Sequence, residues 1–153
     1  MAPVPNRYHQ DVSGNLYFII RTYLEKRPIG AVYQAPFDVY LDEINVHQPD
    51  LIFVSKKNDI LTQAGAEGAP DFIIEILSPK TAFLDKTSKR RTYARSGVKE
   101  LWIVEPETKL IHIYLLQKDA EHPAATYTEK NSFSSSQFPG LKFKGSKIFK
   151  RAG

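Results

Sequence analysis

The spacing of apolar residues changes along the chain and predicts where its helices and strands lie. In residues 8–26, apolar side chains recur every three or four positions, which is the spacing of one helix face. Pro28 and Gly30 then end the helix. In residues 31–41 the period becomes two, which predicts a strand with one apolar face.

Further along, the pattern predicts four more strands and one irregular connection. Short apolar runs predict strands at residues 51–54, 101–104 and 109–116. The run PDFIIEILS, residues 70–78, predicts a strand buried on both faces. Residues 56–69 are polar and glycine-rich, so we expect a mobile connection there.

A second helix is expected between the strand at residues 70–78 and the strand at residues 101–104. Asp85 suits its N-cap and Gly97 its C-terminal cap. Residues 130–149 show only a proline–glycine turn and a short alternating segment. The order of helix, three strands, helix and two strands predicts one α/β domain over residues 1–153, with a central mixed sheet flanked by helices.

Composition narrows the class of protein. With 42% hydrophobic and 25% charged residues the chain has the balance of a soluble globular domain, and it has no apolar run long enough to cross a membrane. The lack of cysteine excludes disulfides, zinc–thiolate sites and thiol nucleophiles, and agrees with a reducing, cytoplasmic location. The net charge of +4 is compatible with a polyanionic partner.

One carboxylate interrupts the most apolar strand. Glu75 stands between two isoleucines, and an unpaired buried carboxylate is costly, so a lysine or arginine partner is the simplest explanation. Asp50, however, opens the preceding strand, and consecutive strands usually lie side by side, so the two carboxylates can converge. Two neighbouring carboxylates repel each other, so each raises the pKa of the other unless a cation lies between their oxygens. Oxygen ligands of this kind suit Mg²⁺.

The helix after this strand supplies a candidate catalytic cation. Lys89 lies in its first turns, and Tyr93 follows one turn later on the same face. Beside a metal, a lysine can orient the attacking water and stabilise the charged transition state of phosphodiester hydrolysis. The alternative is that Lys89 is a solvated lysine on a basic helix.

Taken in order, these segments resemble a known family. The chain resembles the Uma-type putative restriction endonuclease family of the PD-(D/E)XK nuclease superfamily over nearly its whole length. The resemblance rests on the segments HQDVSGNLYFIIRTYL, APFDVYLDE, QPDLIFVS, GAPDFIIEILSP, GVKELWIVEPE and FPGLKF, and on the spacing of Asp85, Lys89 and Tyr93. It implies a restriction-endonuclease-like core in the order αβββαβ.

The resemblance also implies an activity and the residues that carry it. The expected reaction is Mg²⁺-dependent hydrolysis of DNA phosphodiester bonds, with Mn²⁺ able to replace Mg²⁺. Asp50 and Glu75 would hold the metal together with the backbone carbonyl of Ile76. Lys89 would be the catalytic lysine.

Two features depart from the family's common pattern. The position where a lysine usually stands is Leu77, so Lys80 and Lys86 remain alternatives to Lys89. We expect the chain to lack the N-terminal hairpin usual in the family, and the sheet edges that would then be exposed favour a homodimer. The alternative function is a catalytically inactive nuclease-like domain that binds DNA or a protein.

Several further residues are weaker candidates. Tyr93, Asp71 and Arg90 are expected to support the site or bind phosphate, although Asp71, at the start of the Glu75 strand, is more simply a turn-forming cap. The basic helix that carries Arg90 would neutralise phosphates of the substrate. His9 lies near the start of the first helix and could approach the metal site, although a surface imidazole is the simpler expectation.

Overall fold

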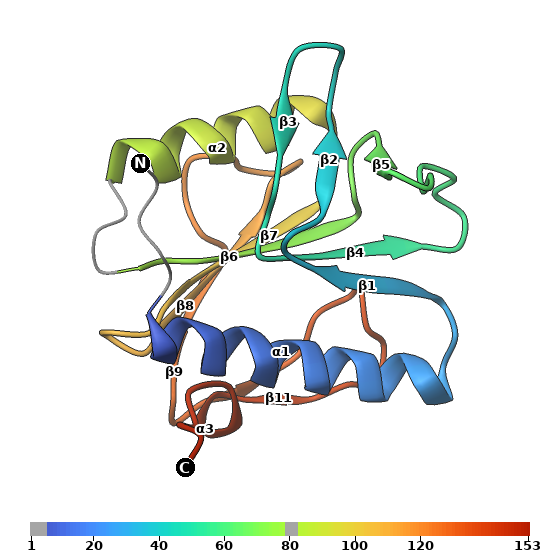
Figure 1. The fold of residues 1–153 in the computed structure, drawn as a ribbon. Coiled ribbons are helices and arrows are strands. Elements are labelled where there is room, and N and C mark those ends of the chain that lie inside the picture. Colours follow the sequence, from blue (N-terminus) through green and yellow to red (C-terminus); the bar gives the residue numbers. More distant parts are fainter. Residues whose placement is uncertain (1–5, 79–82) are drawn as a thin grey trace.

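A computed structural model gives the fold for residues 6–78 and 83–153, without the side chains of residues 83–86. Within these residues a six-stranded mixed sheet forms the centre, with strand order β1-β4-β6-β7-β8-β9. Figure 1 shows helix α1 (Arg7–Lys26) on one face of this sheet and helix α2 (Phe83–Ser96) on the other. The strands are β1 (Gly30–Gln34), β4 (Leu51–Ser55), β6 (Phe72–Ile76), β7 (Glu100–Glu105), β8 (Leu110–Leu115) and β9 (Ala125–Thr128).

Strand pairing decides which residues meet at one end of this sheet. Strands β4 and β6 are antiparallel, with Leu51 opposite Ile74. The residue that precedes β4 therefore lies beside the last residues of β6. Strands β6 and β7 are parallel, because the α2 crossover returns the chain to the end of the sheet where β6 began.

Helix α1 forms where its apolar stripe can be buried on the sheet. Val12, Leu16 and Ile20 are fully buried, at the spacing of one helix face. The side chain of Asn6 caps the first turn by accepting a hydrogen bond from the His9 amide at 2.8 Å. The first predicted helix is confirmed.

The prediction of one strand over residues 31–41 is wrong. Strand β1 ends at Gln34, and Pro36 follows without the N–H that a sheet ladder needs. The chain then enters a second sheet, with strand order β3-β2-β5. Its strands are β2 (Asp38–Tyr40), β3 (Val46–His47) and β5 (Gly65–Glu67). Val32 on β1 packs in the core beside α1, whereas Val39 on β2 packs in the core on the other face of the main sheet.

The expected loop over residues 56–69 also contains regular structure. Strand β5 pairs in parallel with β2, and Ala66 within it is fully buried. The local sequence is polar and rich in glycine, so no apolar period marks this strand. Its position depends on a partner more than twenty residues earlier in the chain, which a local pattern does not reveal.

The second helix and the strands after it agree largely with the prediction. Helix α2 begins at Phe83, so the predicted N-cap role of Asp85 is wrong. Gly97 follows the last helical residue with a φ of +102°, as a C-terminal cap requires. The predicted strand pair is confirmed as β7 and β8, which run antiparallel.

The C-terminal segment completes the core on the α1 side. It adds β10 (Ser132–Phe133), β11 (Phe143–Lys144) and the short helix α3 (Gly145–Ile148). Phe138 is fully buried, and its ring lies 4.8 Å from Phe53 and 5.1 Å from Phe72, between centroids. The turn and short strand expected here therefore belong to a segment that contributes substantially to the core.

Candidate metal and active site

Strands β4 and β6 bring Asp50 and Glu75 together at one end of the sheet. Asp50 directly precedes β4, and its Oδ2 accepts a hydrogen bond from the Ile76 amide at 2.6 Å. The Asp50 amide in turn donates to Oε1 of Glu75 at 3.3 Å. Each carboxylate is thus bonded to the other strand, which holds the two acids side by side.

Helix α2 supplies the partners of the second Glu75 oxygen. Lys89 Nζ lies 3.2 Å from Glu75 Oε2, and the Tyr93 hydroxyl donates to the same oxygen at 3.3 Å. The two residues are four positions apart, so they share one face of α2. The Lys89 side chain is 39% exposed and that of Glu75 only 12%, so the lysine connects the buried carboxylate to the solvent.

The electrostatics of Glu75 show that its protein partners offset only part of the cost of burying its charge. Burial raises the pKa of Glu75 to about 7, the Lys89 charge lowers it, and the nearby Asp50 charge raises it again. The net effect is upward although a lysine lies within ion-pair distance. A further positive charge at this position would stabilise the ionised form.

The donor set at this end of the sheet fits a hard divalent cation. Two carboxylates and the Ile76 backbone carbonyl are oxygen donors, which Mg²⁺ prefers, and Mg²⁺ usually keeps several waters instead of filling its shell with protein. Among the described residues, no group of three or more His, Cys, Asp and Glu side chains forms a metal cluster. A metal here would therefore take only one or two carboxylates from the protein.

His9 belongs to this site, and the expectation of a surface imidazole is wrong. Its side chain is buried, and Nε2 lies 3.4 Å from Asp50 Oδ1. Burial lowers the pKa of His9, but the Asp50 carboxylate and the Ile76 backbone together raise it above the ordinary value. Val12 and Leu16, three and seven positions later, put His9 on the buried face of α1, which is the signal that could have identified it.

A cavity of about 390 Å³ opens next to Asp50. Helix α1 and the end of β1 form its walls, and most of its side chains are polar and uncharged. Its lining residues are His9, Gln10, Ser13, Gly14, Gln34, Ala35 and Asp50. This cavity gives solvent a route to Asp50, whereas Glu75 is not among its lining residues.

The structure does not bring Asp71 to this site. Asp71 precedes β6 and so lies at the opposite end of that strand from Glu75. Its carboxylate accepts hydrogen bonds from the Ser55 amide at 2.8 Å and the Asn58 side chain at 3.0 Å. Burial raises the pKa of Asp71, but these bonds and the Lys99 ammonium together lower it by more, so the net shift is downward. Asp71 ties the end of β4 to β6, in agreement with the cap interpretation.

Arg90 is also directed away from the carboxylates, so the expectation that it binds phosphate is contradicted. Its side chain is only 7% exposed, and Nε donates to the Ala120 carbonyl at 2.6 Å. The guanidinium lies 4.9 Å from the Tyr114 ring centroid and 3.5 Å from a Glu121 oxygen. Arg90 therefore holds α2 against the segment that follows β8.

The alternative lysines cannot be compared with Lys89 by geometry. Lys80 and the side chain of Lys86 lie outside the described residues. Of the expected site residues, the structure brings together Asp50, Glu75, Ile76, Lys89 and Tyr93.

Comparisons with known proteins agree with this fold. Residues 1–145 match the Uma2 family, described as "Putative restriction endonuclease". The fold is similar to the crystal structure of a putative nuclease belonging to DUF820 from Anabaena variabilis ATCC 29413, with a TM-score of 0.77 and 17% identity. That match covers 96% of this chain and 83% of the other, and it confirms the expected α/β class with a central mixed sheet.

No curated protein matches the chain. Within residues 6–78 and 83–153, no helix has both the length and the apolar character needed to span a membrane.

The family match extends over nearly the entire sequence, and on that basis the chain belongs to the Uma2 family of putative restriction endonucleases.

Proposed function

We propose that this protein is a Mg²⁺-dependent endonuclease that hydrolyses DNA phosphodiester bonds. The single observation that carries the proposal is the pairing of the buried Glu75 with the half-buried Asp50, with Lys89 beside them. Membership of a family of putative restriction endonucleases supports the same reaction class. The acid pair and the lysine are the chemical groups that metal-assisted phosphodiester hydrolysis requires.

The metal would be held by the Asp50 and Glu75 carboxylates and the Ile76 carbonyl, with Mn²⁺ able to replace Mg²⁺. Bound there, a divalent ion lowers the pKa of a coordinated water and neutralises charge on the phosphoryl group. His9 fixes the Asp50 carboxylate from the α1 side. Tyr93 fixes Oε2 of Glu75 from the α2 side. The two contacts keep the carboxylates oriented before the substrate arrives.

Lys89 has the position and exposure needed to act on the substrate. Its ammonium is next to Glu75 Oε2 and partly open to solvent. From there it can hydrogen-bond the attacking water or a non-bridging phosphoryl oxygen and stabilise the negative charge that develops in the transition state. We assign Lys89 this role.

The exposed side of α2 provides a surface for the DNA backbone. A cavity of about 460 Å³ lies along it, lined by Thr87, Ser88, Arg91, Thr92 and Arg95. Arginine guanidinium and hydroxyl groups are the usual partners of phosphate oxygens. Arg91 is already held by Glu121, with Nε 3.1 Å from Oε1, so Arg95 is the arginine that would contact phosphate first. Binding through this surface should weaken as the salt concentration rises, because condensed counterions are released from the DNA.

The test is cleavage of supercoiled plasmid with Mg²⁺ or Mn²⁺. Glu75→Ala should abolish nicking while circular dichroism shows the fold intact. Glu107→Ala, which removes an exposed carboxylate outside the site, is the matched control and should cleave like the parent. Equal cleavage by Glu75→Ala and the parent would refute the proposal.

The second candidate is an inactive nuclease-like domain that binds DNA or a protein. It is favoured by one observation: the Lys89–Glu75 ion pair gives the buried carboxylate a partner without any metal. In that case DNA binding would need no divalent ion and plasmid would stay intact. Replacing Glu75 by alanine would then leave DNA binding and stability unchanged or improved.

A further inference from the structure

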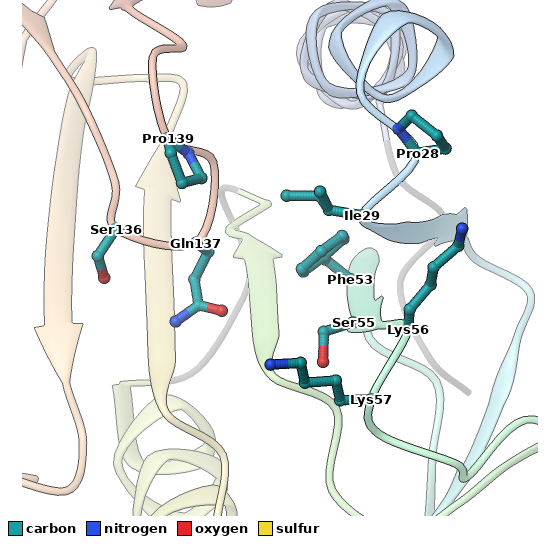
Figure 2. Close-up of a pocket in the computed structure, with 9 residues that line it drawn as sticks. All are labelled: Pro28, Ile29, Phe53, Ser55, Lys56, Lys57, Ser136, Gln137 and Pro139. Carbon is teal, nitrogen blue, oxygen red and sulfur yellow. The ribbon is translucent and has the colours of Figure 1, made fainter.

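A second pocket, of about 430 Å³, lies at the far end of β4 (Figure 2). Ser55 at this end is roughly 17 Å along the strand from Asp50, at about 3.3 Å per residue. The buried Phe53 ring forms part of its wall, with Ile29 and Pro139 beside it. The full lining is Pro28, Ile29, Phe53, Ser55, Lys56, Lys57, Ser136, Gln137 and Pro139. Most of the surface that faces the pocket is apolar, and the pocket is separate from the carboxylate pair.

The two charged side chains that line this pocket, Lys56 and Lys57, are both cations, and the Asp71 carboxylate behind Ser55 is buried and hydrogen-bonded to the Ser55 amide. Figure 2 shows the Lys57 ammonium turned toward Gln137 and the Lys56 side chain turned toward the Pro28 side. The Arg27 guanidinium lies beside the pocket, since Nη1 donates to the Pro139 carbonyl at 2.9 Å. Within the described part of the chain, neither Lys56 nor Lys57 forms an ion pair, and no carboxylate lines the pocket.

We infer that this pocket binds a small amphipathic anion. An apolar, preferably flat group would pack against Phe53, Ile29 and Pro139. A carboxylate, sulfonate or phosphate-ester group would contact the ammonium of Lys57, with the Gln137 amide as a second donor. The volume lies within the range of about 300–1,000 Å³ in which proteins hold small molecules. This site is independent of the proposed nuclease reaction.

The probe is anilinonaphthalene sulfonate, an apolar anion that fluoresces when its rings leave water. Titration of the full chain should show one saturable site. Amide NMR shifts on binding should centre on Ile29, Lys56, Lys57 and Gln137. N-phenylnaphthylamine has the same apolar body without the sulfonate, and should bind about two- to fivefold more weakly because it lacks the ion pair.

Two substitutions test the pocket and its charge separately. Ser136→Trp fills the pocket from an exposed residue and should abolish probe binding. Lys57→Gln should weaken binding of the sulfonate by about two- to fivefold and leave binding of the uncharged probe almost unchanged. Lys118→Gln removes an exposed lysine outside the pocket and should bind like the parent. Circular dichroism verifies that each variant is folded.

Three results would overturn the inference. The first is the absence of a saturable site in the parent. The second is a set of NMR shifts centred away from the pocket residues. The third is unchanged sulfonate binding in folded Ser136→Trp or Lys57→Gln. None of these results bears on plasmid cleavage, so the two sites are judged independently.

Discussion

Glu75 is a carboxylate from which water is nearly excluded, and its two oxygens have different partners. Oε1 accepts the Asp50 amide, while Oε2 accepts Tyr93 and lies against Lys89. These contacts satisfy its hydrogen bonds, yet burial still raises its pKa to about 7. The protein therefore maintains a carboxylate that gains stability from a proton or from an added cation.

The pH dependence of stability should report this state in metal-free protein. Because the folded pKa of Glu75 lies above its ordinary value of 4.5, its stabilisation is complete below about pH 4.5 and is lost as the pH rises to about 7. Across this window the free energy of unfolding of the parent should fall by up to about 3 kcal/mol relative to Glu75→Gln, which cannot ionise. Urea unfolding with EDTA at several pH values measures the difference. A difference that does not change with pH would contradict the assignment.

Lys89 should be required for catalysis but not for metal binding. Lys89→Gln removes the ammonium from a transition state in which charge develops, so cleavage should fall by about 100-fold or more. Plasmid nicking and metal titration of the same variant separate the two roles. Lys80→Gln and Lys86→Gln are the matched controls and should retain cleavage. Loss of cleavage in either of them, with activity kept in Lys89→Gln, would move the catalytic role to that lysine.

Sequence reasoning identified the parts of the site that follow from short-range geometry. Pairing of consecutive strands placed Asp50 beside Glu75, and helical spacing placed Lys89 and Tyr93 on one face. Arg90 was misassigned because one step along a helix turns a side chain by about 100°, and its contacts are with the segment after β8. Those contacts depend on tertiary packing that helix spacing does not encode.

At the scale of elements, local periodicity predicts the helices and strands whose own pattern of apolar residues matches the face that they bury. Helix α1 and strands β4, β6, β7 and β8 were all found this way. The break between β1 and β2 and the pairing of β5 depend on a second sheet built from distant segments. The same limit applies to the C-terminal segment, whose phenylalanines are separated mostly by polar residues, proline and glycine and are buried only by the core that they complete.

The C-terminal segment should contribute strongly to stability. Phe138→Ala removes a fully buried ring that contacts Phe53 and Phe72, and should lower the free energy of unfolding by about 3–5 kcal/mol. Phe18→Ala is the same substitution at a residue that is 70% exposed, and should change it by about 0.5 kcal/mol or less. Urea unfolding compares the two. Similar effects from both variants would contradict the role given to this segment.

At the scale of the whole molecule, the main sheet carries different chemistry at its two ends. Helix α1 runs between them, with His9 near its start against Asp50 and Arg27 at its end against Pro139. The acidic end suits a metal, and the cationic apolar end suits an amphipathic anion. The outermost strands of the sheet are β1 and β9, and a homodimer formed through such an edge stays a prediction.

The most direct test is calorimetric titration of Mn²⁺ or Mg²⁺ at pH 8, where Glu75, with a pKa of about 7, is largely ionised. The parent should show saturable binding that disappears in Asp50→Asn and also in Glu75→Gln. Glu107→Gln should bind like the parent. Binding that survives the loss of either acid, or a parent that binds no divalent ion, would contradict the claim that the two carboxylates together hold a metal.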